Sequence, residues 1–106
     1  MDSQELFEDV KRLNHKKLCP AVNGLGKLME EVGELAQGIN KTTGMKMHDE
    51  DYVDIVDNIA VECADVIQNV YSLAEKFGIT LEQICEKMAA QNVEWEIDID
   101  KQAARM

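Results

Sequence analysis

The chain has 106 residues, of which 11 are Lys or Arg and 21 are Asp or Glu, so its formal net charge is −10. A chain of this length is expected to form a single domain, over residues 1–106, with a small hydrophobic core. Its acidic balance disfavours binding to DNA, to RNA or to an anionic membrane surface, although metal ions could still mediate contact with an anionic small molecule.

The cysteines and the N-terminus indicate a reducing compartment. The three cysteines are odd in number and lack Cys-x-x-Cys spacing, so neither a disulfide framework nor a zinc site is expected. The N-terminus is acidic and has no apolar signal region, and no apolar run approaches membrane-spanning length. We therefore expect a cytoplasmic protein without a membrane partner.

The first half of the chain predicts two amphipathic helices. Over residues 3–15, apolar side chains recur at helical spacing. Cys19 and Pro20 then predict a turn, because proline disfavours helix at the residue before it. Residues 24–40 predict a second helix with an almost continuous apolar stripe.

A polar segment without periodicity, residues 41–51, predicts a loop before the longest helix. That helix, over residues 52–77, has an apolar arc so broad that it should be central in a bundle. Gly78 is a suitable terminator. The remaining stripe of the helix is polar and contains Asn58, Glu62, Asp65, Asn69 and Lys76.

Thr80 and Gln83 have the spacing of a capping box, which predicts the start of a fourth helix. The tail, residues 94–106, is ambiguous: Trp95, Ile97 and Ile99 alternate as in a strand, whereas Trp95 also continues the helical stripe.

Together these segments predict an all-α fold, an antiparallel helical bundle of about four helices. The third predicted helix carries more apolar surface than three partners in so small a domain would cover. We therefore expect a homo-oligomer, either a homodimer or a homotetramer.

The candidate site residues are two pairs of acids, each with a spacing of three residues: Glu31 with Glu34, and Glu62 with Asp65. Residues three apart share a helix face, so two neighbouring helices could aim four carboxylates into one volume. A charged helix stripe is usually a solvated face. Here, however, the second pair lies on the polar stripe of a largely apolar helix, and the acids would repel one another without a cation. Mg²⁺ or Mn²⁺ would fit, because hard divalent ions prefer carboxylate oxygen.

Residues 28–35 (LMEEVGEL) and 62–67 (ECADVI) resemble the MazG-like nucleotide pyrophosphohydrolases, in the all-α NTP pyrophosphatase superfamily, whose signature is E-x-x-E followed by E-x-x-D. The resemblance covers about residues 22–93. It implies an enzyme that cleaves nucleoside triphosphates to monophosphate and pyrophosphate in nucleotide-pool housecleaning. It also implies a catalytic Mg²⁺ site, with Mn²⁺ as a substitute, whose ligands are Glu31, Glu34, Glu62 and Asp65.

The resemblance implies further substrate contacts. Asn92 resembles an asparagine near the end of the fourth helix that holds the nucleotide, and Asn69 could serve similarly one turn after the second acid pair. The basic residues that relatives carry after that asparagine are missing, because the first ones here are Lys101 and Arg105. Phosphate binding could instead fall to Lys27, next to the first acid pair, or to Lys76, Lys101 or Arg105. Of the four acids, Glu34 is our choice of general base, because it lies furthest from the apolar seam.

Two other classes of protein remain open. The missing basic residues are also compatible with a non-catalytic helical oligomerisation module that keeps a structural or relict metal site. A carboxylate-bridged di-iron bundle ranks last, because neither His15 nor His48 follows a glutamate by three residues. The sequence does not specify the base, the sugar, or whether neighbouring subunits share the site.

Overall fold

The computed structural model describes residues 1–17 and 21–106. It contains four helices and, within these ranges, no strand: α1 (Ser3–Lys17), α2 (Ala21–Asn40), α3 (Tyr52–Lys76) and α4 (Leu81–Ala104). The predicted all-α fold of four helices is therefore confirmed. The turn predicted at Cys19 and Pro20 lies outside the described residues. Within the described ranges, no helix combines the length and the apolar character needed to cross a membrane.

The boundary between α3 and α4 has clear local causes. Gly78 adopts a positive φ of 71°, which glycine tolerates without a steric penalty, and this ends α3. The predicted capping box at the start of α4 is present. The Gln83 backbone N–H donates to Thr80 Oγ1 at 3.1 Å, and the Thr80 N–H donates to Gln83 Oε1 at 2.8 Å. The ambiguous tail is helical as far as Ala104.

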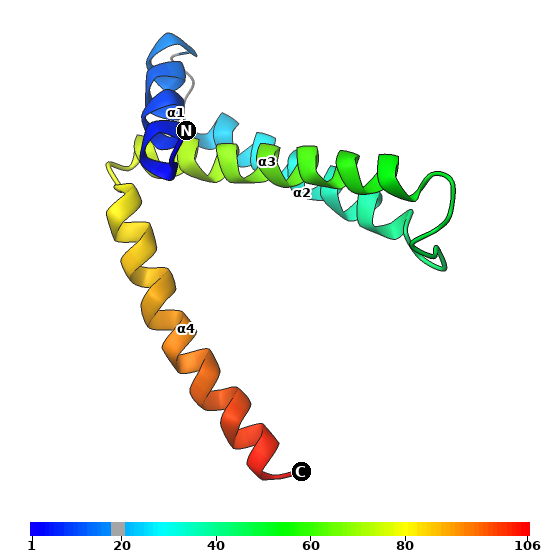
Figure 1. The fold of residues 1–106 in the computed structure, drawn as a ribbon. Coiled ribbons are helices and arrows are strands. Elements are labelled where there is room, and N and C mark those ends of the chain that lie inside the picture. The colour runs from blue at the N-terminus through cyan, green and yellow to red at the C-terminus, as the bar shows by residue number, and fades with distance from the viewer. Residues whose placement is uncertain (18–20) are drawn as a thin grey trace.

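Helices α2 and α3 lie side by side as an antiparallel hairpin, joined by residues 41–51 (Figure 1). Two glycines of α2 face α3. A Cβ added at Gly24 would lie 2.9 Å from Leu73 Cδ2, and one added at Gly38 would lie 3.4 Å from Ile59 Cγ1. The helices therefore approach closely at both ends of the hairpin.

Helix α1 packs against the C-terminal half of α3. The ring of Phe7 meets Tyr71 edge to face, with centroids 5.2 Å apart and an interplanar angle of 72°. The Asn14 side chain donates to the Ser72 carbonyl oxygen at 2.9 Å and accepts from Ser72 Oγ at 2.6 Å. Phe7 and Val10 are buried here, and with Ala74 and Leu81 they form a small core.

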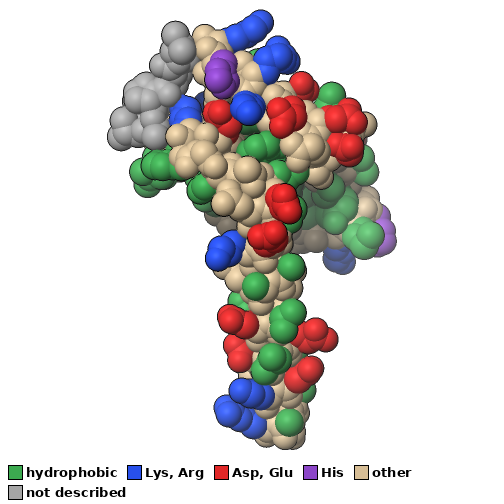
Figure 2. Space-filling view, turned by 90° about the vertical axis from the view of Figure 1, so that its left-hand side faces the viewer, with side chains coloured by type: hydrophobic (Ala, Val, Ile, Leu, Met, Phe, Trp, Pro, Cys, Tyr) green, Lys and Arg blue, Asp and Glu red, His purple; other side chains and the backbone are tan. Residues whose placement is uncertain are grey.

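Helix α4 projects away from the other three helices (Figure 1). Leu81, its first residue, is its one buried residue in the described chain. Figure 2 shows hydrophobic side chains exposed along this helix. The radius of gyration is 17.5 Å, against about 13 Å for a compact chain of this length. The bundle within one chain therefore consists of α1, α2 and α3.

Candidate functional site

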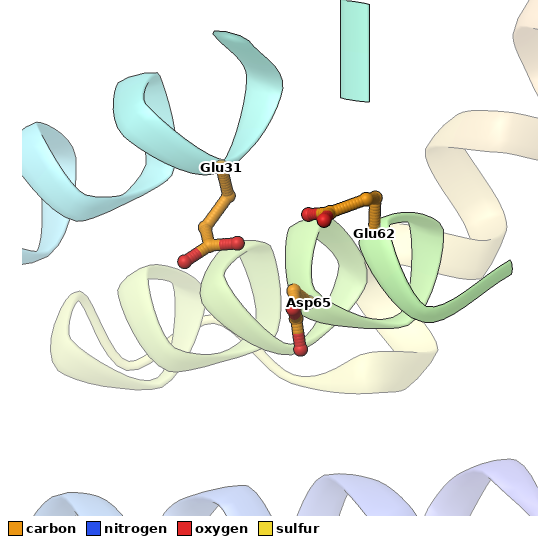
Figure 3. A group of neighbouring side chains, drawn as sticks. All are labelled: Glu31, Glu62 and Asp65. Carbon is orange, nitrogen blue, oxygen red and sulfur yellow. The ribbon is translucent and has the colours of Figure 1, made fainter. Parts of the chain in front are cut away.

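The hairpin geometry brings three of the predicted acids together. Glu31 is seven residues from both Gly24 and Gly38, so it shares the face of α2 that packs on α3. Directly across from it lies the helical turn of α3 that carries Glu62 and Asp65 (Figure 3). One carboxylate oxygen from each of these three acids lies within 4.8 Å of the others. We call these three residues the carboxylate cluster.

The cluster is short of partners for its negative charge. Glu31 is only 5% exposed. Its Oε2 atom and that of Glu62 are buried, without a hydrogen-bond partner among the described residues. An unsatisfied buried polar atom costs about 1–3 kcal/mol, and more when it is charged. Three carboxylates with unused oxygen atoms fit a hard divalent cation such as Mg²⁺ or Mn²⁺, which prefers oxygen ligands.

Lys27 lies at the edge of the cluster, one turn before Glu31. Its Nζ is 3.0 Å from Glu31 Oε1 and 3.8 Å from Glu30 Oε1. The hydrogen bond to Glu31, together with the charges of Glu30 and Glu31, raises the pKa of Lys27. With all groups ionised, three carboxylates and one ammonium leave a formal charge of −2, which a single divalent cation would neutralise. Glu30 itself is exposed, as its position on the helical wheel predicts.

Glu34, the fourth predicted ligand, lies beside the cluster rather than in it. Three residues along a helix turn the side chain by about 300°, so Glu34 lies about 60° from Glu31 around α2, and it lines a pocket together with Ile55, Asn58 and Glu62 of α3. It is exposed. The negative charge of Glu31 is the main cause that raises the pKa of Glu34, with smaller contributions from desolvation and from Glu62. Glu34 therefore holds its proton to a higher pH than an isolated glutamate does.

Two pockets of about 210 Å³ each flank the cluster along α3. The first, here called the α1-side pocket, is lined by Val10, Leu13, Asn14, Lys27, Glu31, Asp65, Gln68, Asn69 and Ser72. The second, here called the loop-side pocket, is lined by Glu34, Gln37, Gly38, Lys41, Ile55, Asn58 and Glu62. The cluster separates them, since two of its acids line the first pocket and one lines the second.

The predicted substrate-binding residues are placed differently from one another. Lys27 and Asn69 both line the α1-side pocket, where the Asn69 side chain donates to the Asp65 carbonyl oxygen at 2.7 Å. Asn92 is exposed on the projecting α4, so a single chain does not bring it to the cluster.

Lys41 is a pocket residue that the sequence reasoning missed. It follows Glu34 by seven residues, and two helical turns return to the same face. This spacing could have indicated that Lys41 lies near Glu34. Lys41 is, however, the first residue after α2 and falls in the segment predicted as a loop, where helical spacing was not applied.

A family model described as phosphoribosyl-ATP pyrophosphohydrolase matches residues 4–92 of the chain. No curated protein and no solved structure shows a significant match. The matched segment contains the whole carboxylate cluster and both flanking pockets, and it ends at Asn92. It also includes α1, which the resemblance noted from the sequence, over residues 22–93, leaves out.

Proposed function

Because the chain belongs to the phosphoribosyl-ATP pyrophosphohydrolase family, we propose that it hydrolyses the bond between the α and β phosphates of a nucleotide and releases pyrophosphate. Phosphoribosyl-ATP is our first choice of substrate, since the matched family bears its name. An ordinary nucleoside triphosphate, as in housecleaning by the MazG-like enzymes, is the second. Both molecules carry a triphosphate, so both need the same chemistry at the cluster.

The observation that carries the proposal is the buried carboxylate cluster with its unsatisfied oxygen atoms. An acidic protein can hold a polyanionic triphosphate at such a place only through cations. Glu31, Glu62 and Asp65 would hold Mg²⁺, or Mn²⁺ in its place. When bound, the metal would offset charge on the phosphates and lower the pKa of a water molecule.

The remaining groups of the site have separate tasks in this proposal. Glu34 takes the proton of the attacking water, because it lines a pocket together with Glu62 and keeps a carboxylate outside the cluster. Lys27 offsets one charge of Glu31, and Asn69 lies where it can contact the substrate.

Substrate competition tests the choice of nucleotide. We expect kcat/KM for phosphoribosyl-ATP to exceed that for ATP and for the other ribo- and deoxynucleoside triphosphates by about tenfold or more, equivalent to about 1.4 kcal/mol of transition-state binding. Mixed-substrate assays with Mg²⁺ would measure the ratio directly. A preference for one ordinary nucleoside triphosphate would contradict the first choice and support housecleaning. Stabilisation by Mg²⁺ without turnover of any nucleotide would favour the non-catalytic module.

We also propose that the working unit is a homodimer or a homotetramer. The single chain exposes 8322 Å², roughly 2,000 Å² more than a compact monomer of its mass. On the hairpin, seven apolar residues that are 40–67% exposed share one face, at spacings of 3, 4, 7 or 11 residues that fit whole helical turns: Leu25, Met29, Val32 and Ile39 on α2, and Val56, Ile67 and Val70 on α3. We call these seven residues the apolar hairpin face.

Helical spacing places the apolar hairpin face on the opposite side of the hairpin from the acids. A second copy could therefore cover this face and leave the cluster accessible. The excess area matches what each chain of an obligate oligomer buries, roughly 1,000–2,500 Å². Exposed apolar residues of α4, among them Met88, Val93 and Trp95, would then pack on a neighbouring copy. By this route we propose that Asn92 reaches a nucleotide.

A further inference from the structure

The two pockets beside the cluster differ in their chemistry, and each contains one lysine: Lys27 on the α1 side and Lys41 on the loop side. Each pocket has a volume of about 210 Å³, whereas sites that enclose a whole drug-sized ligand measure about 300–1,000 Å³. Neither pocket alone accommodates a complete nucleotide triphosphate. A nucleotide at the cluster would have to extend into both.

The carboxylate cluster forms the boundary at which the two pockets meet. Glu31 and Asp65 line the α1-side pocket and Glu62 lines the loop-side pocket, yet the three acids have oxygen atoms within 4.8 Å of one another. A bond broken at the cluster would therefore leave one product in each pocket. Hydrolysis between the α and β phosphates yields a nucleoside monophosphate and pyrophosphate, so the pockets must divide these two products.

The linings indicate which product goes where. The α1-side pocket combines the apolar side chains of Val10 and Leu13 with the carboxamides of Gln68 and Asn69. The carboxamides can hydrogen-bond to the edge of a base and to ribose hydroxyls, and the two aliphatic side chains can contact the apolar faces of the base and the sugar. Lys27, the lysine of that pocket, is already paired with Glu31 at 3.0 Å, which suits it to the less charged of the two products.

The loop-side pocket is lined by polar groups and one large aliphatic side chain, Ile55. Its groups able to donate to phosphate oxygen are the ammonium of Lys41 and the carboxamides of Gln37 and Asn58. Within residues 1–17 and 21–106, Lys41 forms no ion pair, so its charge is not already committed there as that of Lys27 is. Its backbone N–H donates to the Gln37 carbonyl oxygen at 3.2 Å, which anchors it to the end of α2.

We infer that Lys41 binds the pyrophosphate product in the loop-side pocket, where water activated by Glu34 attacks the β phosphorus, and that the nucleoside monophosphate leaves into the α1-side pocket beside Lys27. This inference rests on the proposed function. Lys41 would then be the phosphate-binding cation of a chain that lacks basic residues directly after Asn92. Lys41 is a binding residue in this scheme, and the general base remains Glu34.

Product inhibition tests the assignment. In the presence of Mg²⁺, Lys41→Met should raise the inhibition constant of pyrophosphate by about tenfold or more, because a charge-assisted contact is lost, and should leave that of the monophosphate product within about twofold. Lys27→Met should show the opposite pattern. Lys11→Met, on α1 in a pocket remote from the cluster, is the control and should change neither constant. Unchanged pyrophosphate inhibition in Lys41→Met, or equal losses for both products, would overturn the inference.

The assignment can also be tested apart from catalysis. If the wild-type protein turns over no nucleotide, the proposed reaction fails, and calorimetric titration with Mg²⁺ and pyrophosphate then decides the role of Lys41. Binding that Lys41→Met weakens and Lys27→Met does not would support the pyrophosphate site. Absent binding in the wild type, or equal binding in both variants, would refute it.

Discussion

Replacing Glu62 with Gln should lower kcat by roughly 100-fold or more. Mutating a residue that only hydrogen-bonds to a metal ligand typically costs 10–100-fold in activity, and losing the ligand itself should cost more. The amide keeps the shape of the side chain but removes its charge from a group whose Oε2 is buried without a partner. Steady-state assays at saturating Mg²⁺ would measure the loss. Circular dichroism should show that the helices are intact.

Without metal, the same variant should be more stable than the wild type, although it is less active with metal. Glu62→Gln removes one of three mutually repelling carboxylates, so the metal-free variant should melt a few degrees higher than the wild type. Its stabilisation by added Mg²⁺ should shrink. Glu86→Gln, an exposed glutamate on α4, is the matched control and should change neither property. Wild-type turnover in Glu62→Gln, or undiminished stabilisation by Mg²⁺, would refute the assignment of this residue to a metal site.

Val32→Glu should dissociate the proposed oligomer. Val32 is 47% exposed in the single chain and lies at the centre of the α2 part of the apolar hairpin face. Covering a carboxylate there without a partner would cost several kcal/mol, so subunit affinity should fall by about 100-fold or more. Light scattering after size exclusion should find the wild type at twice or four times the chain mass of 12.0 kDa and the variant at lower mass.

A matched substitution separates loss of the interface from a general effect of added charge. Val61→Glu makes the same change at a residue that is 53% exposed, but on the side of α3 away from the apolar hairpin face. It should keep the mass of the wild type. A wild-type mass of 12.0 kDa at micromolar concentration would refute the oligomer. Equal dissociation by both variants would refute this face as the interface.

Helical periodicity in the sequence was sufficient to predict the elements of the fold. The Thr80–Gln83 capping box marked the start of α4 correctly. Helix α2 begins at Ala21 rather than at residue 24, where the predicted helix starts. Gly24 lies inside the helix and permits close packing on Leu73. The projection of α4 could not be predicted, because an apolar stripe shows that a helix has a partner but not which chain supplies it.

The grouping of acidic side chains was predictable from two conditions: the acids are spaced to share one face of a helix, and the two helices that carry them are neighbours. Both conditions hold for Glu31, Glu62 and Asp65, and the class of nucleotide pyrophosphohydrolase inferred from them is confirmed by the family match. Glu34 lies about 60° from Glu31 around α2 and outside the cluster, and its role as a fourth ligand stays a prediction. Lys41 was missed because pocket membership depends on how α2 ends beside α3.

The central claim is that the carboxylate cluster supports metal-dependent cleavage between the α and β phosphates. Phosphorus NMR of the reaction products tests it most directly, with the wild-type protein, Mg²⁺, phosphoribosyl-ATP and a panel of nucleoside triphosphates. We predict a nucleoside monophosphate and pyrophosphate, formed with Mg²⁺ and lost on chelation. Formation of a diphosphate and inorganic phosphate, or no turnover of any nucleotide in the panel, would contradict the claim.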